Sequence, residues 1–156
     1  MSEPANNGAL KGLRVVEMGQ LLAGPFCGQL LGDMGADVIK IEAPGKGDPM
    51  RVWGLGAEKV QWEVIARNKR SVTCNLRVPE GQAIARALIE KADILVENFK
   101  PGTLEKWGLS PDELHKINPG LIIARMSGYG ANGALFHPRR FRRHWRGDGR
   151  MALHRR

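Results

Sequence analysis

The stretch LRVVEMGQLLAGPFCGQLLGDMGADVIKIE, residues 13–42, decides the fold. Residues 13–18 and 37–42 are short apolar runs rich in β-branched side chains, which are typical of strands. Between them, Pro25 suits the first turn of a helix. Apolar residues continue from there at helical spacing: Phe26, Leu30, Leu31 and Met34. A strand, a helix and a second strand predict two parallel strands joined by a crossover helix, and therefore a doubly wound α/β fold.

The rest of the chain repeats this alternation. The predicted strands cover residues 72–76, 94–96 and 121–126. The predicted helices cover residues 60–67, 79–89 and 110–118. In the helix at 79–89, Ile84, Leu88 and Ile89 are expected to form one buried face. Ser110 and Glu113 form a capping box at the start of the last helix. The alternation of strands and helices along the chain predicts an open α/β sheet.

A polar and aromatic pair, Asn98 and Phe99, follows directly after the predicted strand at 94–96. This places the pair at the carboxyl end of the strand, where open α/β sheets bind their ligands. Pro101-Gly102 then predicts a turn, and Thr103 is expected to cap the short segment that carries Lys106 and Trp107. An ordinary corner between a strand and a helix is the structural alternative for this stretch.

Other loops bear on the kind of ligand. The loop after Met18 lacks the G-x-G-x-x-G spacing of a dinucleotide site, which disfavours a nicotinamide or flavin enzyme. The Gly/Pro-rich loop 43–51 is either a solvated connection or a basic loop beside anionic ligand groups. Lys69 and Arg70 are either a solvated strand edge or phosphate donors.

The charge of the chain lies almost wholly in its last twenty residues. The 156-residue chain has a formal net charge of +8, and from His137 onward it holds eight Arg, no Lys and one acid, Asp148. The preceding residues are therefore nearly neutral, which disfavours a nucleic-acid-binding body. Binding of nucleic acid by the basic tail remains an alternative, for which salt-sensitive binding lost on removal of residues 137–156 is the test.

The two cysteines and the N-terminus indicate the compartment. Cys27 and Cys74 form no metal or redox spacing and suit buried thiols in a reducing environment, so no metal site is expected. Residues 1–9 are polar and lack the apolar core of a signal peptide, and no apolar run has membrane-spanning length. We expect a cytoplasmic protein with no membrane partner.

Six ordered motifs between residues 10 and 133 closely resemble the class III CoA-transferases, the family that includes formyl-CoA transferase, carnitine CoA-transferase and α-methylacyl-CoA racemase. The motifs are A-G-P-F-C at 23–27, G-A-D-V-I-K-I-E at 35–42, G-D-P-M-R at 47–51, N-K-R-S at 68–71, A-D-I-L-V-E-N-F-K-P-G at 92–102 and S-G-Y-G at 127–130. The resemblance implies a Rossmann-like large domain in an interlocked homodimer. It also implies a coenzyme A thioester as substrate, a carboxylic acid as its co-substrate, and no permanently bound cofactor.

The resemblance also implies ten CoA-binding residues in the loops that follow the predicted strands. They are Leu21, Leu22, Ala23, Ala43, Cys74, Arg77, Asn98, Phe99, Lys106 and Trp107. Arg77 and Lys106 are suited to pair with phosphates, Phe99 to pack on adenine, and backbone amides near Ala23 to bind polar oxygens at a helix N-terminus. Many relatives carry Arg where this chain has Ala43, so one electrostatic contact with CoA is expected to be missing.

No catalytic residue is assigned. In the transferases of this family a carboxylate attacks the thioester and forms a mixed anhydride with the enzyme. That Asp follows a glycine-rich loop beyond the S-G-Y-G motif and has no counterpart here, since Asp148 matches nothing in the family. We expect an inactive acyl-CoA transferase fragment, with the racemase branch, which moves a proton at the α-carbon, as the alternative within the family.

Three segments are expected: a flexible N-terminus at 1–9, part of a large domain at 10–133, and a disordered Arg-rich tail at 134–156. The tail has neither helical nor strand periodicity. GC-rich codons chosen for residues 139–154 and shifted by one base read AGFGAIGEAMGGWRY, which resembles the family's continuation. We hypothesise a frameshift near Gly133, which the gene sequence would test.

Overall fold

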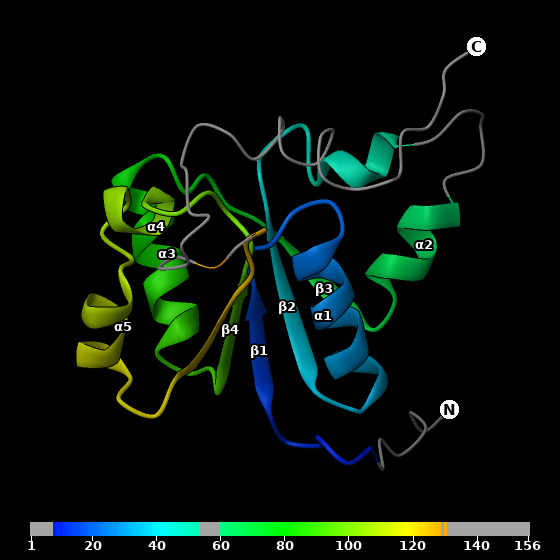
Figure 1. Ribbon diagram of the computed structural model, residues 1–156, viewed down its shortest axis with the longest axis horizontal. Helices are drawn as coiled ribbons and strands as arrows, with labels where there is room; N and C mark the ends of the chain where they lie inside the picture. Colours follow the sequence, from blue (N-terminus) through cyan, green and yellow to red (C-terminus); the bar gives the residue numbers. More distant parts are fainter. Residues whose placement is uncertain (1–7, 54–59, 129, 131–156) are drawn as a thin grey trace.

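Five parallel strands form the centre of the computed structural model, which describes residues 8–53, 60–128 and 130. The strands are β1 (Arg14–Glu17), β2 (Asp37–Glu42), β3 (Lys69–Thr73), β4 (Ile94–Glu97) and β5 (Ile122–Arg125). Their order across the sheet is β3-β2-β1-β4-β5 (Figure 1), and every neighbouring pair is parallel. The predicted Rossmann-like α/β sheet is thus confirmed.

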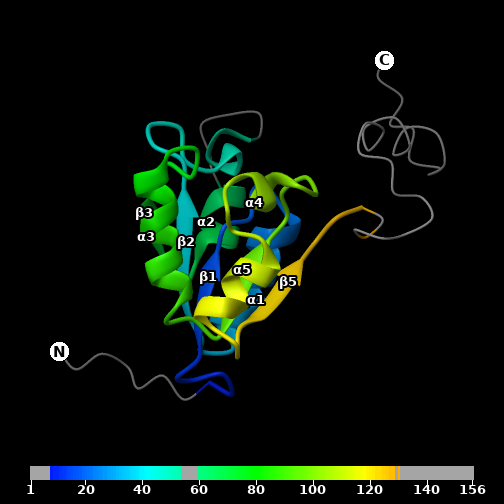
Figure 2. The same cartoon turned by 90° about the vertical axis from the view of Figure 1, so that its left-hand side faces the viewer.

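Helices cover both faces of this sheet. They are α1 (Ala23–Asp33), α2 (Val60–Ala66), α3 (Pro79–Ile89), α4 (Thr103–Lys106) and α5 (Pro111–Ile117), with a short 3₁₀ turn η1 (Pro49–Val52) after β2. In Figure 1, α1 and α2 lie on one side of the sheet and α3, α4 and α5 on the other, and Figure 2 turns the side of α3, α4 and α5 toward the viewer. The structure is a three-layer α/β arrangement, in which each strand leads through a helix to the next parallel strand.

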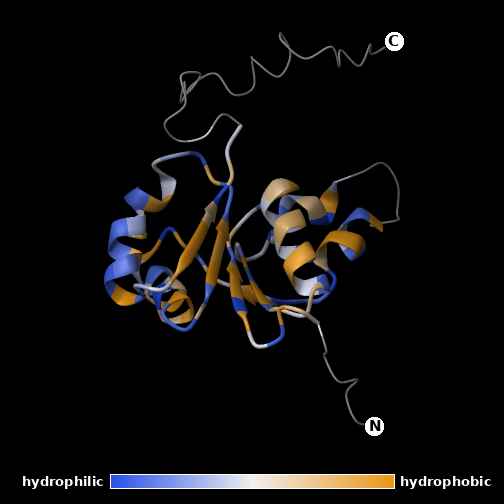
Figure 3. Cartoon of the chain, turned by 60° about the horizontal axis from the view of Figure 1, so that its bottom comes forward, coloured by the Kyte–Doolittle hydropathy of each residue, from blue (hydrophilic) through white to orange (hydrophobic). Residues whose placement is uncertain are grey.

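The core consists of two apolar clusters, one on each face of the sheet. Successive side chains of a strand point to opposite faces, so Val15 of β1 packs toward α1 while Val16 packs toward α3. Both valines are fully buried, as are Leu95 and Val96 of β4. Figure 3 shows the apolar strands between the two helical layers. Burial on both faces explains why the central strands are continuous apolar runs.

Most predicted elements are confirmed, but the start of β3 is corrected. We predicted a strand from Val72, and it begins at Lys69. Lys69 and Arg70 pair in register with Val38 and Ile39 of β2. Their charges are compensated across the sheet, because Lys69 reaches Glu17 and Arg70 forms an ion pair with Asp37. Acids on β1 and β2 thus let two cations occupy the start of a strand that the local sequence does not indicate.

The glycines of α1 decide which side of the helix packs on the sheet. The buried face of α1 contains its small residues, among them Gly24, Gly28 and Gly32, whereas Phe26 and Met34 are each 52% exposed. The glycines let the helix backbone approach the sheet closely: a Cβ on Gly28 would lie 2.1 Å from Glu17 Oε2. Close approach along the glycine face leaves Phe26, Leu30 and Met34 exposed, whereas Leu31 is half-buried against the core.

Of the smaller predictions, some are confirmed and others are wrong. Ser110 caps α5 by accepting a hydrogen bond from the Glu113 amide, as predicted. In α3, Ile89 is buried as predicted but Ile84 is 50% exposed. Thr103 does not cap α4, because Gly102, with a φ of 85°, occupies the cap position. Among residues 8–53 and 60–128, no helix is long and apolar enough to cross a membrane.

Candidate functional site

Four β–α loops meet at the carboxyl edge of the sheet. These loops and the helices α1 and α4 that directly follow two of them carry the ten predicted CoA-binding residues. Parallel strands end at the same edge, so the loops after β1, β2, β3 and β4 are brought together there. The chain direction across the sheet reverses between β1 and β4, which are hydrogen-bonded neighbours. Ligands of open α/β sheets bind at this reversal point. The loops after β1 and β4 therefore form the centre of the candidate site.

Hydrogen bonds of the Asn98 side chain connect these two loops. Its side-chain oxygen accepts a hydrogen bond from the Gln20 amide at 2.7 Å, and its Nδ2 donates to the Gln20 carbonyl at 2.9 Å. Leu21 follows with a φ of 64°, a left-handed conformation that is uncommon for leucine. The backbone amides of Leu22 and Ala23, at the start of α1, have no hydrogen-bond partner among the described residues. The loop thus presents unpaired donors at the sheet edge.

The loop after β4 supplies an aromatic pair and a cation. The rings of Phe99 and Trp107 pack edge to face with centroids 5.2 Å apart, and both side chains are half-buried against the core. Lys106 is exposed at the end of α4, and its ammonium has no ion-pair partner among the residues that the structure describes. Two aromatic rings and a cation in the same stretch of chain suit a flat, anionic ligand such as a nucleotide.

The two residues predicted in the loop after β3, Cys74 and Arg77, differ in their exposure. The side chain of Cys74 lies in the core, where its Sγ donates to the Gly81 carbonyl at 3.1 Å and burial raises the pKa of the thiol. Only the main chain of Cys74 is available to a ligand. Arg77 is exposed, and its guanidinium is unpaired within the described part of the chain. Arg77 is therefore the cation that this loop offers.

Ala43, after β2, lines a polar hollow of about 260 Å³. The hollow is also lined by Glu42, Gly45, Lys46, Gly47, Arg51, Ser71 and Thr73. The Arg51 guanidinium donates two hydrogen bonds to Glu42, at 2.7 and 2.8 Å, so its charge is already neutralised. Of the cations predicted for the loop 43–51, only Lys46 is left unpaired by the described residues.

Four buried charges lie directly behind these loops, and we call Glu17, Lys40, Asp48 and Lys69 the buried charge cluster. The Lys40 ammonium contacts Glu17 Oε1 at 2.7 Å and Asp48 Oδ2 at 2.8 Å, and Lys69 contacts Glu17 Oε2 at 2.7 Å. All four side chains are at most 2% exposed. Burial lowers the pKa of Lys69, and Glu17 opposes that effect. With two carboxylates and two ammonium groups, the cluster is neutral as a whole.

Sequence reasoning missed this cluster. Each of the strands β1, β2 and β4 ends in a glutamate, and Glu17, Glu42 and Glu97 are all buried. Each has cationic partners from other parts of the chain; for Glu97 the partner is Arg125 of β5, at 2.7 Å. A glutamate repeated at the end of apolar strands was the available signal, because a buried carboxylate needs a partner.

Glu42 makes the stability of the loop 43–51 sensitive to acid. Burial alone would raise the pKa of Glu42, but hydrogen bonds from Arg51, Ser71 and the Asp48 amide outweigh it and lower the pKa to about 2. An unfolded glutamate titrates near ~4.3. The stabilisation is therefore complete above pH ~5 and is lost as the pH falls toward about 2.

We expect wild-type protein to lose on the order of 3 kcal/mol more of its free energy of unfolding between pH ~5 and ~2 than Glu42→Gln. Urea unfolding at a series of pH values measures this difference. Ser71→Ala removes one of the three donors to Glu42 and should shift the acid transition to higher pH. Equal acid sensitivity of wild type and Glu42→Gln would contradict the assignment.

The two cations N-terminal in β3, proposed as phosphate donors, are already engaged. Lys69 also donates to the Pro25 carbonyl at 2.5 Å, and Arg70 pairs with Asp37. The described residues hold no group of three metal-ligating side chains. Tyr129, Asp148 and the whole Arg-rich tail lie outside the described residues.

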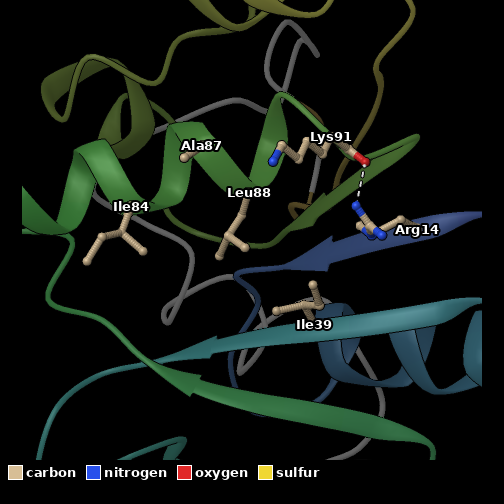
Figure 4. Close-up of a pocket in the computed structure, with 6 residues that line it drawn as sticks. All are labelled: Arg14, Ile39, Ile84, Ala87, Leu88 and Lys91. Atoms are coloured by element: carbon tan, nitrogen blue, oxygen red, sulfur yellow. Dashed lines mark hydrogen bonds between the residues drawn. The ribbon is translucent and has the colours of Figure 1, made fainter.

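A second hollow, of about 300 Å³, lies away from the candidate site (Figure 4). It is lined by Arg14, Ile39, Ile84, Ala87, Leu88 and Lys91. Arg14 begins β1 and Lys91 precedes β4, so this hollow lies toward the amino ends of those strands. None of the predicted ligand-binding residues lines it.

The sheet, its reversal point and the cationic and aromatic loops define an α/β protein with a ligand site at its carboxyl edge. The sequence profile of CoA-transferase family III matches residues 10–143, and the chain belongs to this family. The match extends ten residues beyond the predicted boundary at residue 133.

Curated relatives include the succinyl-CoA–D-citramalate CoA-transferase of Chloroflexus aurantiacus, which is 58% identical over 127 residues, 80% of this chain and 32% of that relative. The succinate–glutarate CoA-transferase of Agrobacterium fabrum is 41% identical over 139 residues, 83% of this chain and 35% of the relative. This chain spans about a third of the length of these relatives.

Solved structures agree with this assignment. A CAIB/BAIF family protein from Brucella suis superposes with a TM-score of 0.75 at 44% identity, covering 81% of this chain and 35% of that chain. The hypothetical protein Rv3272 from Mycobacterium tuberculosis gives a TM-score of 0.76 at 42% identity, covering 83% of this chain and 36% of that one.

Proposed function

We propose that this chain carries a coenzyme A site of an acyl-CoA transferase. The observation that supports the proposal most directly is the convergence of four β–α loops at one sheet edge. They bring together unpaired backbone amides after β1, the cations Arg77 and Lys106, and the Phe99–Trp107 pair. Phosphates suit the amides and cations, and an adenine ring suits the aromatic pair. In this proposal the other predicted residues line the site chiefly through their main chain or by shaping its loops: Leu21, Leu22, Ala43, Cys74 and Asn98.

The names of the relatives support a proposal for the substrate class. Their names specify succinyl-CoA or succinate, with citramalate or glutarate as the second acid. We propose that a short dicarboxylic acyl-CoA is the donor here and a second carboxylic acid the acceptor. Because the curated relatives described above are named as transferases, this reaction is favoured over racemisation, and no observation on the described residues favours nucleic-acid binding.

The proposed chemistry needs a free carboxylate. In the first step a carboxylate oxygen attacks the thioester carbonyl, the C–S bond breaks, and CoA leaves as a thiolate while an anhydride forms. Glu17, Glu42, Asp48 and Glu97, the buried acids near the site, are all ion-paired. None is available as the nucleophile, so we propose that the 156-residue chain binds CoA without transferring it. We also propose that residues 10–133 form part of the large domain of this family. For the longer family members, we propose a homodimer located in the cytoplasm.

Turnover tests the second half of this proposal. Purified chain incubated with succinyl-CoA and a dicarboxylic acid is expected to yield no exchanged thioester by liquid chromatography. Exchange above that of the buffer would contradict the proposed lack of activity and leave the proposed CoA site standing.

Binding tests the site itself. Titration calorimetry should show CoA binding to the wild-type chain, and Arg77→Ala and Lys106→Ala should each weaken it about tenfold, since each removes one charge-assisted contact with phosphate. Raising the salt concentration should weaken wild-type binding more than binding to either variant.

Lys11→Ala is the matched control for these variants. Lys11 is an exposed cation that precedes β1, at the opposite edge of the sheet, so its removal should leave CoA affinity unchanged. A folded wild-type chain that binds no CoA, or equal losses in all three variants, would contradict the proposed site.

A further inference from the structure

The loop Gln20–Ala23 is held in place by side chains from three other parts of the chain. Asn98 binds both the amide and the carbonyl of Gln20, and the Lys40 ammonium donates to the Gly19 carbonyl at 2.9 Å. The Leu21 amide donates to Asp48 Oδ1 at 3.1 Å. Since Leu21 is left-handed, these contacts are needed to offset the unfavourable conformation of a leucine at this position.

Asp48 is the link between this loop and the buried charge cluster. Its Oδ1 accepts hydrogen bonds from the amides of Leu21 and Met50, and its Oδ2 contacts the Lys40 ammonium. Its own amide donates to Glu42 Oε2 at 2.8 Å. Every polar group of Asp48 named here has a fixed partner, so the carboxylate cannot rotate without breaking buried contacts.

Asp48 is only 2% exposed, so it has almost no surface with which to contact a ligand. Its effect on a ligand must pass through the main chain of Leu21. The same residue anchors the loop 43–51, which carries Ala43, to the loop 20–23. Two segments of the proposed CoA site are thereby fixed relative to one another before any ligand binds.

We propose that Asp48 is a positioning residue: it holds Leu21 in its left-handed conformation and so preorganises the backbone amides at the start of α1 for the phosphates of CoA. This inference rests on the proposed CoA site. Lys40 and Glu17 act one step further away, by fixing the Asp48 carboxylate. The loop is therefore rigid in the free protein, and CoA binds without ordering it.

Two substitutions separate the acceptor oxygen of Asp48 from its charge. Asp48→Asn keeps an oxygen for the Leu21 amide but loses the ion pair with Lys40, whereas Asp48→Ala loses both. Both variants should be less stable in urea. At a temperature where circular dichroism shows each to be folded, CoA affinity should fall about tenfold in Asp48→Ala and stay within about threefold of wild type in Asp48→Asn.

Leu114→Ala is the control for lost stability alone. Leu114 is 1% exposed in α5, away from the loop, and its truncation should destabilise the protein without changing CoA affinity more than about twofold. Equal loss of affinity in Asp48→Asn and Asp48→Ala would overturn the proposal, and so would an equal loss in Leu114→Ala.

Amide hydrogen exchange tests the same inference without CoA. The Leu21 amide should exchange about tenfold or more faster in Asp48→Ala than in Asp48→Asn. The Val16 amide, within β1, should still exchange only through global unfolding in both variants. Unchanged exchange at Leu21 would overturn the positioning role. A wild-type chain that fails to bind CoA but shows this exchange pattern would contradict the proposed function and leave the role of Asp48 in the loop intact.

Discussion

Gly81→Ala should destabilise the protein by about 3 kcal/mol or more, although alanine is the better helix former by about 1 kcal/mol. Gly81 is buried in the first turn of α3, where a Cβ would lie 1.9 Å from the carbonyl oxygen and 2.6 Å from the carbonyl carbon of Asn75. These are main-chain atoms of the turn that leaves β3, so no side-chain rotation relieves the clash. Either α3 or the loop that carries Arg77 must move.

Urea unfolding followed by circular dichroism measures this loss. Gly120→Ala is the matched control, because the nearest atom to its Cβ would be Asn118 Oδ1, at an ordinary contact distance of 3.8 Å. The control should change the free energy of unfolding by less than about 0.5 kcal/mol. Equal stability of Gly81→Ala and Gly120→Ala would show that α3 does not pack on this turn as described.

Gly28→Ala should cost about 2–3 kcal/mol, for a different reason. A Cβ there would lie 2.1 Å from Glu17 Oε2 and 3.0 Å from Glu17 Cδ. The end of a glutamate side chain normally moves aside easily. Glu17 cannot, because it is fully buried and Lys40 and Lys69 hold its two oxygens at 2.7 Å. The added methyl group must therefore break an ion pair of the buried charge cluster or displace α1.

A double-mutant cycle identifies this cause. Glu17→Asp shortens the side chain by one methylene and should destabilise the protein by itself, because both lysines lose contact distance. The double variant Gly28→Ala/Glu17→Asp should be more stable than the sum of the two single losses predicts, by about 1 kcal/mol or more. Leu30→Ala, on the exposed side of the same helix, should have a small effect. Additive losses would contradict the clash with Glu17.

The fold was largely predictable because its information is local. Apolar runs of strand length alternate with helical spacing, and Pro25, Ser110 and Asn118 mark helix boundaries that the structure reproduces closely. The start of β3 was not predictable, since the charges of Lys69 and Arg70 are compensated only by Glu17 on β1 and Asp37 on β2. The exposed side of α1 depends likewise on how closely its glycines approach β1.

The sequence predicted where in the fold the candidate site lies, but not the buried ion pairs and hydrogen bonds that hold its loops in place. Strand ends alone placed Asn98 and Phe99 at the carboxyl edge of the sheet. The buried charge cluster depends on the register of the sheet, which sets Glu17 opposite Lys40. Local spacing carries no information on register between strands 23 residues apart. The hydrogen bonds from Asn98 to Gln20 show that a residue predicted as a ligand contact also fixes the loop beside it.

The sheet order has a consequence for folding during synthesis. Strand β1 lies at the centre of the sheet but pairs with β4, which leaves the ribosome some eighty residues later. The four members of the buried charge cluster all lie between residues 17 and 69, so their partners are available as soon as β3 has emerged. Glu97 and Asn98 arrive later, and Glu97 must await Arg125. The nascent chain can thus neutralise its first buried charges well before β4 brings the Asn98 contacts with Gln20.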